Sequence, residues 1–124
     1  MKVLKFGGTS VKDAFAMQRV FDIISADNIT KLVVLSACSG ITDKLIILLN
    51  YAANSNEKEM RSTFNFIKEH HINLLNNLIF PSNPFYNQSV NKIKQILDEL
   101  FNFANSILFL KEATSKSLDK ILSF

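Results

Sequence analysis

The sequence is poor in the residues that would point to secretion, membrane insertion or nucleic-acid binding. Its 124 residues include one cysteine and no tryptophan, and a single cysteine cannot form an internal disulfide, which favours a reducing compartment. Apolar runs such as Leu45–Leu49 are far shorter than the ~20 residues that cross a bilayer. The formal net charge is +3, but the lysines and arginines form no dense cluster. We therefore expect a cytoplasmic protein with neither a nucleic-acid nor a membrane partner.

The composition that remains is that of a globular protein. Hydrophobic residues make up 48% of the chain and charged residues 20%, which argues against disorder. A compact domain of this length buries roughly two thirds of its unfolded surface, so a core can form. With 124 residues the chain amounts to one domain at most, and it contains no internal repeat, low-complexity tract or interdomain linker.

Glycine is scarce, and two of the three glycines stand together in the stretch Lys2–Val11. An apolar segment, Lys2–Phe6, is followed by Gly7 and Gly8 and then by two hydroxyl residues. A strand, a glycine turn and a helix in succession bring backbone N–H groups to a phosphate, because glycine has no Cβ to keep the anion away. Lysine precedes the glycines and no Gly-Lys-Ser/Thr follows them, so this is not a Walker A loop.

The pattern around this turn predicts a strand, a helix and a second strand. Lys2–Phe6 is predicted to be buried on both faces of a parallel sheet. Ser10 and Asp13 have the spacing of a capping box. Apolar residues then recur at helical intervals, which predicts a helix of about four turns: Ala14, Met17, Phe21 and Ile24. Lys31–Leu35 is predicted as a second buried strand, parallel to the first. In such a sheet ligands bind beyond the carboxyl ends of the strands.

Lys5 is the unusual residue of the first strand. A lysine ammonium in an apolar strand must either extend to solvent or meet an anion. The strand alone leaves both possibilities open, and the adjoining glycine turn favours the anion.

A second turn, Ser36–Asp43, follows the second strand. Its hydroxyl groups on Ser36, Ser39 and Thr42, with N–H groups at a helix N-terminus, suit a small carboxylate. Alternatively, these hydroxyls only cap the next helix. Cys38 lies in the same turn, and no base is placed by sequence to activate it, so we interpret it as a packed side chain.

The remainder of the sequence is predicted to be helical. Apolar spacing predicts helices from Thr42 to Ala53, from Glu57 to about Leu78 and from Ser89 to about Leu110, with a loop between Pro81 and Pro84. His70 and His71 are adjacent, point about 100° apart on a helix and have no Glu-x-x-His partner, so we interpret them as structural.

The two turns together resemble a known family. Lys5–Val11, Lys-Phe-Gly-Gly-Thr-Ser-Val, resembles the opening motif of the aspartate kinases of the amino-acid kinase superfamily. Ser36, Gly40 and Thr42 match the serine, glycine and threonine of that family's second motif. The helical block 43–111 is similar to the long insertion of lysine-sensitive single-function enzymes and of those fused to homoserine dehydrogenase. Residues 117–124 resemble the start of a third motif, which continues in the family with Gly-Glu.

The resemblance implies an α/β fold, a partial three-layer αβα amino-acid kinase fold in which N-terminal parallel strands are followed by a helical insertion. The chain would be the N-terminal portion of a catalytic domain, with strand-helix-strand over 1–36 and a substrate turn over 36–43. The parent would transfer the γ-phosphoryl group of MgATP to the β-carboxylate of L-aspartate, the first step of lysine, threonine and methionine biosynthesis. It would act as a homo-oligomer.

The resemblance also implies a role for each site residue. Lys5 would be catalytic and, with four neighbours, would bind the ATP phosphates: Gly7, Gly8, Thr9 and Ser10. Ser36, Gly40 and Thr42 would bind aspartate. No metal ligand is expected in this chain, which would be incomplete alone. The alternatives are a non-catalytic kinase module that acts as a binding or assembly partner, and a kinase for another amino acid.

Overall fold

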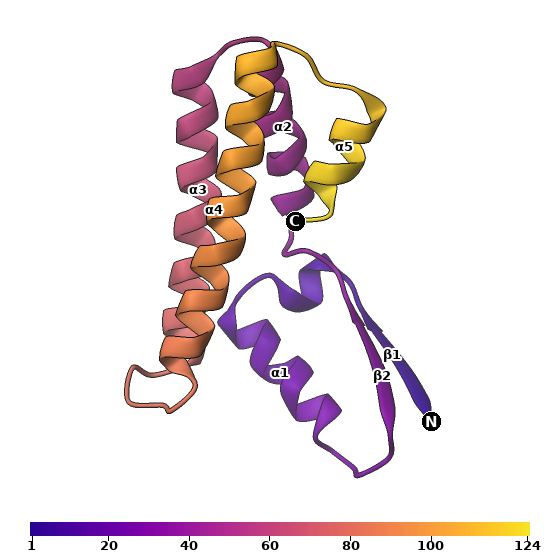
Figure 1. Cartoon of the computed structure of the whole chain (residues 1–124). Coiled ribbons are helices and arrows are strands. Elements are labelled where there is room, and N and C mark those ends of the chain that lie inside the picture. Colours follow the sequence, from indigo (N-terminus) through magenta and orange to yellow (C-terminus); the bar gives the residue numbers. More distant parts are fainter. The chain divides into compact units, whose positions relative to one another are not determined.

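The computed structural model describes all residues from 1 to 124, which form two units, Met1–Thr42 and Asp43–Phe124. Figure 1 labels the strands and the α-helices. The elements are two strands, a 3-10 helix (η1) and five α-helices: β1 (Lys2–Phe6), η1 (Gly8–Val11), α1 (Ala14–Ile24), β2 (Lys31–Leu35), α2 (Ile41–Ala53), α3 (Glu57–Leu78), α4 (Tyr86–Leu110) and α5 (Ser115–Leu122).

The first unit is built on a two-stranded parallel sheet. β1 and β2 pair in register from Lys2 opposite Lys31 to Phe6 opposite Leu35, so both strands end level. Both strands have the predicted bounds, and their parallel pairing is confirmed. The α/β fold class is confirmed as well.

A carboxylate fixes the amino ends of the two strands. Asp27 Oδ2 lies 2.6 Å from Lys2 Nζ, and Asp27 Oδ1 lies 2.6 Å from Lys31 Nζ. Asp27 Oδ1 also accepts a hydrogen bond from the N–H of Ile29. These contacts lower the pKa of the Asp27 carboxyl, with the hydrogen bond from Lys2 as the largest cause. One side chain thus joins the start of both strands to the turn that follows α1.

The helix after the glycine turn begins later than its sequence pattern predicts. Residues 8–11 form the 3-10 helix, and Ser10 donates its backbone N–H to Gly7 O at 3.0 Å. The N-cap is Asp13, whose Oδ1 accepts from Ala16 N at 2.8 Å. The predicted capping box at Ser10 is therefore wrong, and α1 has 11 residues, which is about three turns rather than four.

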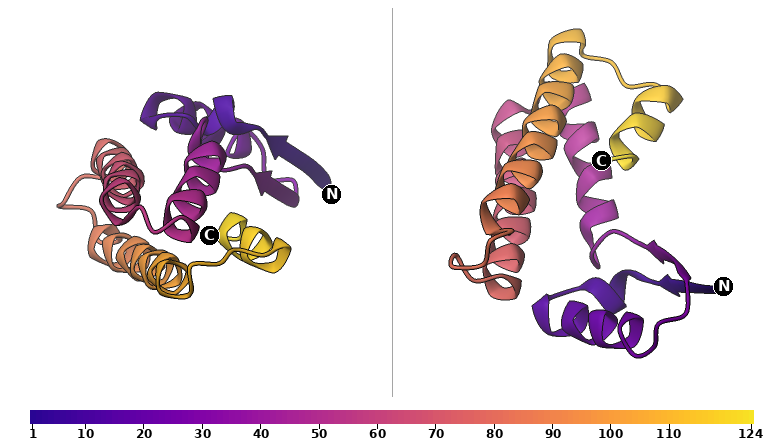
Figure 2. Two further views of the ribbon diagram at one scale, coloured as in Figure 1. Left: turned by 90° about the horizontal axis from the view of Figure 1, so that it is seen from above. Right: turned by 60° about the horizontal axis from the view of Figure 1, so that its bottom comes forward.

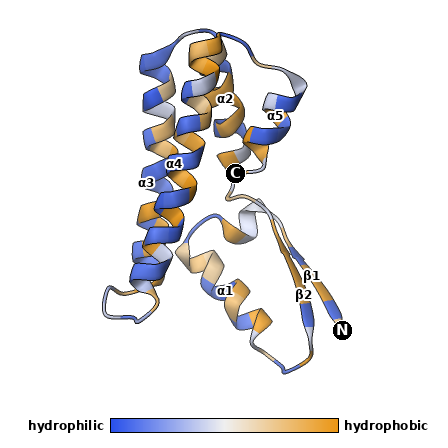
Figure 3. Cartoon of the chain, viewed as in Figure 1, coloured by the Kyte–Doolittle hydropathy of each residue, from blue (hydrophilic) through white to orange (hydrophobic).

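The strands are also more exposed than predicted. Val3, Leu32 and Val34 lie on one face of the sheet and are 63%, 51% and 43% exposed. Burial on both faces is therefore wrong for this chain. The apolar sequence of the strands is suited to a covered sheet, and Figure 3 shows it as hydrophobic colouring along β1 and β2, but the 124 residues leave that face bare.

The second unit is helical, and its helices follow the predicted pattern closely. α3 has the predicted bounds, whereas α4 begins at Tyr86, three residues before the predicted Ser89. Asn83 explains the difference, because its Oδ1 accepts from Phe85 N and its carbonyl oxygen accepts from Tyr86 N. This local bonding turns the chain into the helix immediately after Pro84.

α3 and α4 lie side by side, as Figures 1 and 2 show. The Phe64 and Phe101 rings have centroids 4.8 Å apart, and the Arg61 guanidinium lies over the Phe101 ring at 5.3 Å. Tyr86 OH donates to Asn76 Oδ1 at 2.7 Å. Buried apolar side chains form the core of the unit, among them Leu48, Met60, Leu100, Ala104 and Ile121. None of the helices combines the length and apolar character needed to cross a membrane.

Candidate functional site

The two candidate turns meet at the carboxyl ends of β1 and β2. Ser36 donates its N–H to Phe6 O at 3.0 Å, which extends the strand pairing by one bond. Ser39 then donates its N–H to Gly8 O at 3.2 Å. The glycine turn and the hydroxyl turn are thus hydrogen-bonded to each other, as expected for two loops at one edge of a parallel sheet.

The glycines of these turns have different surroundings. A Cβ on Gly8 would lie 3.2 Å from Ala37 O and 3.4 Å from Ser39 N, so glycine lets the two turns approach closely. A Cβ on Gly7 would meet nothing within 4 Å, and the backbone of Gly7 is extended, with φ −78°. Gly40 has φ +81°, a left-handed conformation that favours glycine. A Cβ on Gly40 would also meet nothing within 4 Å. Gly7 is therefore the glycine of the first turn whose backbone is open to a ligand.

Lys5 lies next to this turn with its ammonium group free. Strand alternation places it on the face opposite Phe6. The Lys5 side chain is exposed, and the ion pairs of the structure, Lys2–Asp27, Lys31–Asp27 and Arg61–Glu57, do not include it. An unpaired cation beside an open glycine turn is suited to an anionic ligand.

The hydroxyl residues of both turns are also without protein partners. Thr9 and Ser10 lie in η1, and neither hydroxyl forms a side-chain cap there. Ser36 is exposed directly after β2, and Thr42 is exposed in the first turn of α2. None of the side-chain hydrogen bonds of the structure involves Ser36, Ser39 or Thr42. The alternative that these hydroxyls only cap α2 thus has no hydrogen bond to support it.

Cys38 is the one buried side chain between the exposed serines of the second turn, and it is 6% exposed. Burial raises the pKa of its thiol. A thiol in this state is protonated near neutral pH and is a poor nucleophile, so the cysteine packs the turn.

The histidine pair and the acidic residues do not form a metal centre. No group of three or more His, Cys, Asp or Glu side chains lies where it could hold a metal ion. His71 Nδ1–H donates to Ile67 O at 2.7 Å, a bond within α3. Burial lowers the pKa of His70, so both side chains belong to the helix packing.

Comparison with known proteins relates the chain to one group of enzymes. No protein-family model matches it. It is 56% identical over 46 residues to the lysine-sensitive aspartokinase 3 of Escherichia coli and 33% identical over 115 residues to the bifunctional aspartokinase/homoserine dehydrogenase of Buchnera aphidicola. These alignments cover 37% and 90% of the chain. It is also 48% identical over 50 residues, 40% of the chain, to a Haemophilus influenzae protein named "Putative inactive aspartokinase 3".

Solved structures agree with the sequence relatives. E. coli aspartokinase III, in a complex with lysine and aspartate, superposes with a TM-score of 0.82 at 29% identity and covers 99% of the chain. The same enzyme in a complex with aspartate and ADP gives 0.81 at 30% identity, again over 99% of the chain. The chain belongs to the aspartokinase family. It spans 10%, 14% and 41% of the three sequence relatives and 25% of the E. coli structures.

In this member of the aspartokinase family, four of the predicted residues lie at one edge of the sheet. Lys5, Gly7 and Gly8 end one strand, and Ser36 begins the turn after the other. The sequence did not reveal the bond between Ser39 and Gly8, because it depends on how two distant turns pack. The Asp13 cap could have been found, since aspartate directly before an apolar helix is a preferred N-cap.

Proposed function

We propose that the chain forms part of the catalytic domain of an aspartate kinase. Its parent would transfer the γ-phosphoryl group of MgATP to the β-carboxylate of L-aspartate and form 4-phospho-L-aspartate, the first step of lysine, threonine and methionine biosynthesis in the cytoplasm. The observation that carries the proposal is the pair of hydrogen-bonded turns at one sheet edge in a member of this family. A related structure holds aspartate and ADP, which supports aspartate and an adenine nucleotide as the ligands here.

In this proposal each turn holds one substrate. Gly7 and Gly8 let backbone N–H groups reach the ATP phosphates, and the free Lys5 ammonium neutralises charge that develops on the phosphoryl group. Thr9 and Ser10 shape the turn that follows. Ser36, Gly40 and Thr42 orient aspartate, whose carboxylate is ionised near neutral pH and needs no general base. Catalysis of this kind depends on positioning and charge neutralisation.

The residues present fit the phosphates of ATP but not its magnesium ion. The open space beside Gly7 and the unpaired Lys5 suit an anion. No acidic cluster that could hold Mg²⁺ lies among these 124 residues, so we assign no residue of this chain to the ion. The remaining nucleotide contacts and the assembly of subunits belong to the proposed parent.

Substitution of Lys5 in the longer protein tests the proposal. Lys5→Ala should lower turnover ~100-fold or more, the scale for loss of one preorganised charge-stabilising donor. Lys68→Ala is the control, because Lys68 is exposed on α3 and takes part in no ion pair; its turnover should stay near that of the parent. Near-normal turnover of the Lys5 variant would refute the catalytic role.

A second candidate is a non-catalytic module, and the relative whose name marks it as inactive favours it. Reading the coding sequence beyond Phe124 separates the two. A continuation into a further kinase lobe supports the enzyme, whereas an immediate stop codon supports a binding or assembly partner.

If the longer protein phosphorylates glutamate, acetylglutamate or uridylate in preference to aspartate, the acceptor proposed here is wrong.

A further inference from the structure

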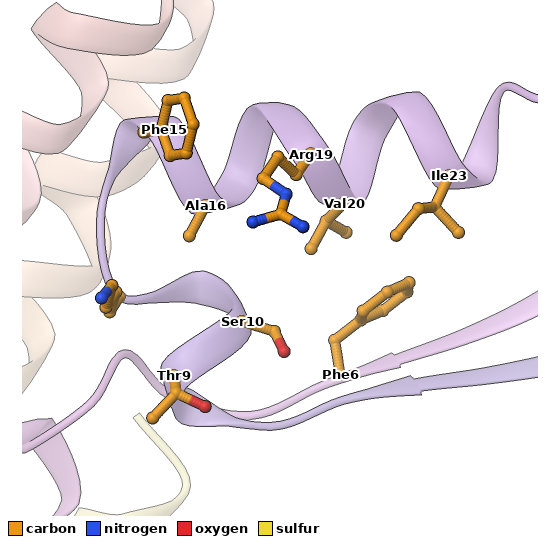
Figure 4. A pocket seen from close by; sticks show the side chains of 9 residues that line it. Phe6, Thr9, Ser10, Phe15, Ala16, Arg19, Val20 and Ile23 are labelled. Atoms are coloured by element: carbon orange, nitrogen blue, oxygen red, sulfur yellow. The ribbon is translucent and has the colours of Figure 1, made fainter.

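A pocket lies on the other face of β1, within the unit formed by residues 1–42. It has a volume of about 360 Å³ and is bounded by α1, η1 and the end of β1. Figure 4 shows Val20 and Ile23 projecting from α1 toward Phe6, with the Arg19 guanidinium and the Ser10 hydroxyl at the same space. The volume is at the small end of the range for ligand sites.

The charged residues that line this pocket are all basic. Lys12 and Arg19 both line it, and no aspartate or glutamate does. Neither cation takes part in an ion pair of the structure. Two acids lie close to these cations in sequence. Asp13, next to Lys12, is occupied as the N-cap of α1, and Asp22, three residues after Arg19, accepts a hydrogen bond from Gln18. Two unpaired cations therefore lie beside an apolar surface.

Unpaired cations beside apolar side chains suit a ligand that has an anionic group and an apolar part. A guanidinium binds a carboxylate or a phosphate through two parallel hydrogen bonds. The side chains of Phe6, Val20 and Ile23 offer apolar contact to the rest of such a molecule, and Ile23 is 51% exposed, so burial of its free surface favours binding.

We propose that this pocket binds a small molecule with an anionic group, a carboxylate or a phosphate, on an apolar body. Arg19 and Lys12 bind the anion, and the Ser10 hydroxyl donates a hydrogen bond to it. The site is separate from the proposed aspartate turn and lies on the face of β1 opposite Lys5. It goes beyond the proposed phosphoryl transfer, with which it shares Thr9 and Ser10.

Nuclear magnetic resonance titration of the whole 124-residue chain tests this site. Phenyl phosphate and benzoate are the two probes, and inorganic phosphate and benzyl alcohol are controls that carry only the anion or only the ring. We expect saturable shifts at the amides of η1 and α1 with at least one probe, and much weaker binding of both controls. The probe that binds more tightly shows whether the pocket prefers a phosphate or a carboxylate.

Variants at the pocket then assign the contacts. Arg19→Gln should weaken binding of the stronger probe ~10-fold or more, because a charge-assisted bidentate contact is lost. Arg19→Lys should recover part of that loss. Arg61→Gln is the matched control, since Arg61 is in α3 and is paired with Glu57, and it should bind the probe like the unmodified chain.

Three results would overturn the proposal. They are the absence of saturable shifts at η1 and α1, equal affinity of the Arg19→Gln variant in a chain whose spectrum shows it folded, and binding of inorganic phosphate as tight as that of phenyl phosphate. The test contains neither ATP nor aspartate, so its failure is distinct from failure of the proposed kinase function.

Discussion

At the scale of single residues, the glycines of the two turns have different expected roles: Gly40 stabilises the fold, and Gly7 leaves room for a ligand. Gly40 has φ +81°, so Gly40→Ala should lower the free energy of unfolding by ~1–2 kcal/mol, the cost of a left-handed conformation for an L-residue. Gly7 is extended and has open space around it. Gly7→Ala should therefore raise the free energy of unfolding by ~0.4–1 kcal/mol, because the unfolded chain loses freedom.

Urea denaturation of the two variants beside the unmodified chain measures both values. Equal loss of stability in the two variants would contradict this distinction. In the longer protein, Gly7→Ala should raise the KM for ATP, since the added Cβ occupies the space through which the phosphate reaches the backbone. A stable variant with an unchanged KM for ATP would remove Gly7 from the proposed phosphate site.

Thr42 distinguishes substrate binding from helix capping. Its hydroxyl makes no hydrogen bond within the chain although the residue lies in the first turn of α2. If it binds a carboxylate, Thr42→Ala in the longer protein should raise the KM for aspartate by an amount equivalent to ~1.5–3 kcal/mol and leave the KM for ATP nearly unchanged. Thr42→Ser, which keeps the hydroxyl, is the control. Equal effects on both substrates would instead favour a structural role.

At the scale of elements, Asp27 makes the pairing of β1 and β2 dependent on pH. Its native pKa lies below the ordinary value of 3.8, because Lys2 and Lys31 donate to its carboxylate. A lowered native pKa adds stability that is fully present well above pH 3.8 and is lost as the pH falls below it toward the native pKa. We expect the unmodified chain to lose stability over this acid range.

Asp27→Asn should be less stable near neutral pH and should show a smaller loss on acidification. Asp22→Asn is the control, since Asp22 accepts only from Gln18, on the same helix. Urea midpoints of the three proteins at pH 7, 4 and 3 provide the comparison. Parallel pH profiles for the unmodified chain and Asp27→Asn would show that this carboxylate does not fix the strands.

The elements also show what a sequence pattern can predict. The bounds of β1, β2 and α3 follow from apolar periodicity, because each element has a continuous pattern and a clear break at its ends. The starts of α1 and α4 do not follow from apolar periodicity. Side chains decide them locally, with Asp13 capping one helix and Asn83 turning the chain into the other, and such bonds compete with the helical pattern.

The sequence predicts the two turns of the candidate site separately, but not the hydrogen bond that joins them at the edge of the sheet. Lys5, Gly7, Ser36 and Thr42 were indicated by their residue types after predicted strands. The bond from Ser39 to Gly8 depends on a close approach between turns about thirty residues apart, which no local pattern encodes. The sequence pattern did not predict the pocket beside Arg19, because a single arginine on a helix is typical of a solvated surface.

At the scale of the whole molecule, the chain consists of a helical unit with a buried core and a smaller unit whose sheet has a bare face. Val3, Leu32 and Val34 lie on that face together with Lys5, and both strands have a free edge because the sheet has only two strands. Apolar, unpaired strands are templates for association with another chain. The chain by itself should therefore associate as its concentration rises.

Analytical ultracentrifugation over a range of concentrations tests this expectation. A double variant, Leu32→Thr with Val34→Thr, should shift association to ~10-fold higher concentration or more, because it removes apolar surface from the sheet while threonine keeps a preference for strands. Phe109→Gln is the control: Phe109 is 90% exposed, but on α4. If the control variant weakens association and the double variant does not, exposed side chains at the end of α4 drive it instead. If both variants associate like the unmodified chain, neither group of side chains is responsible for the association.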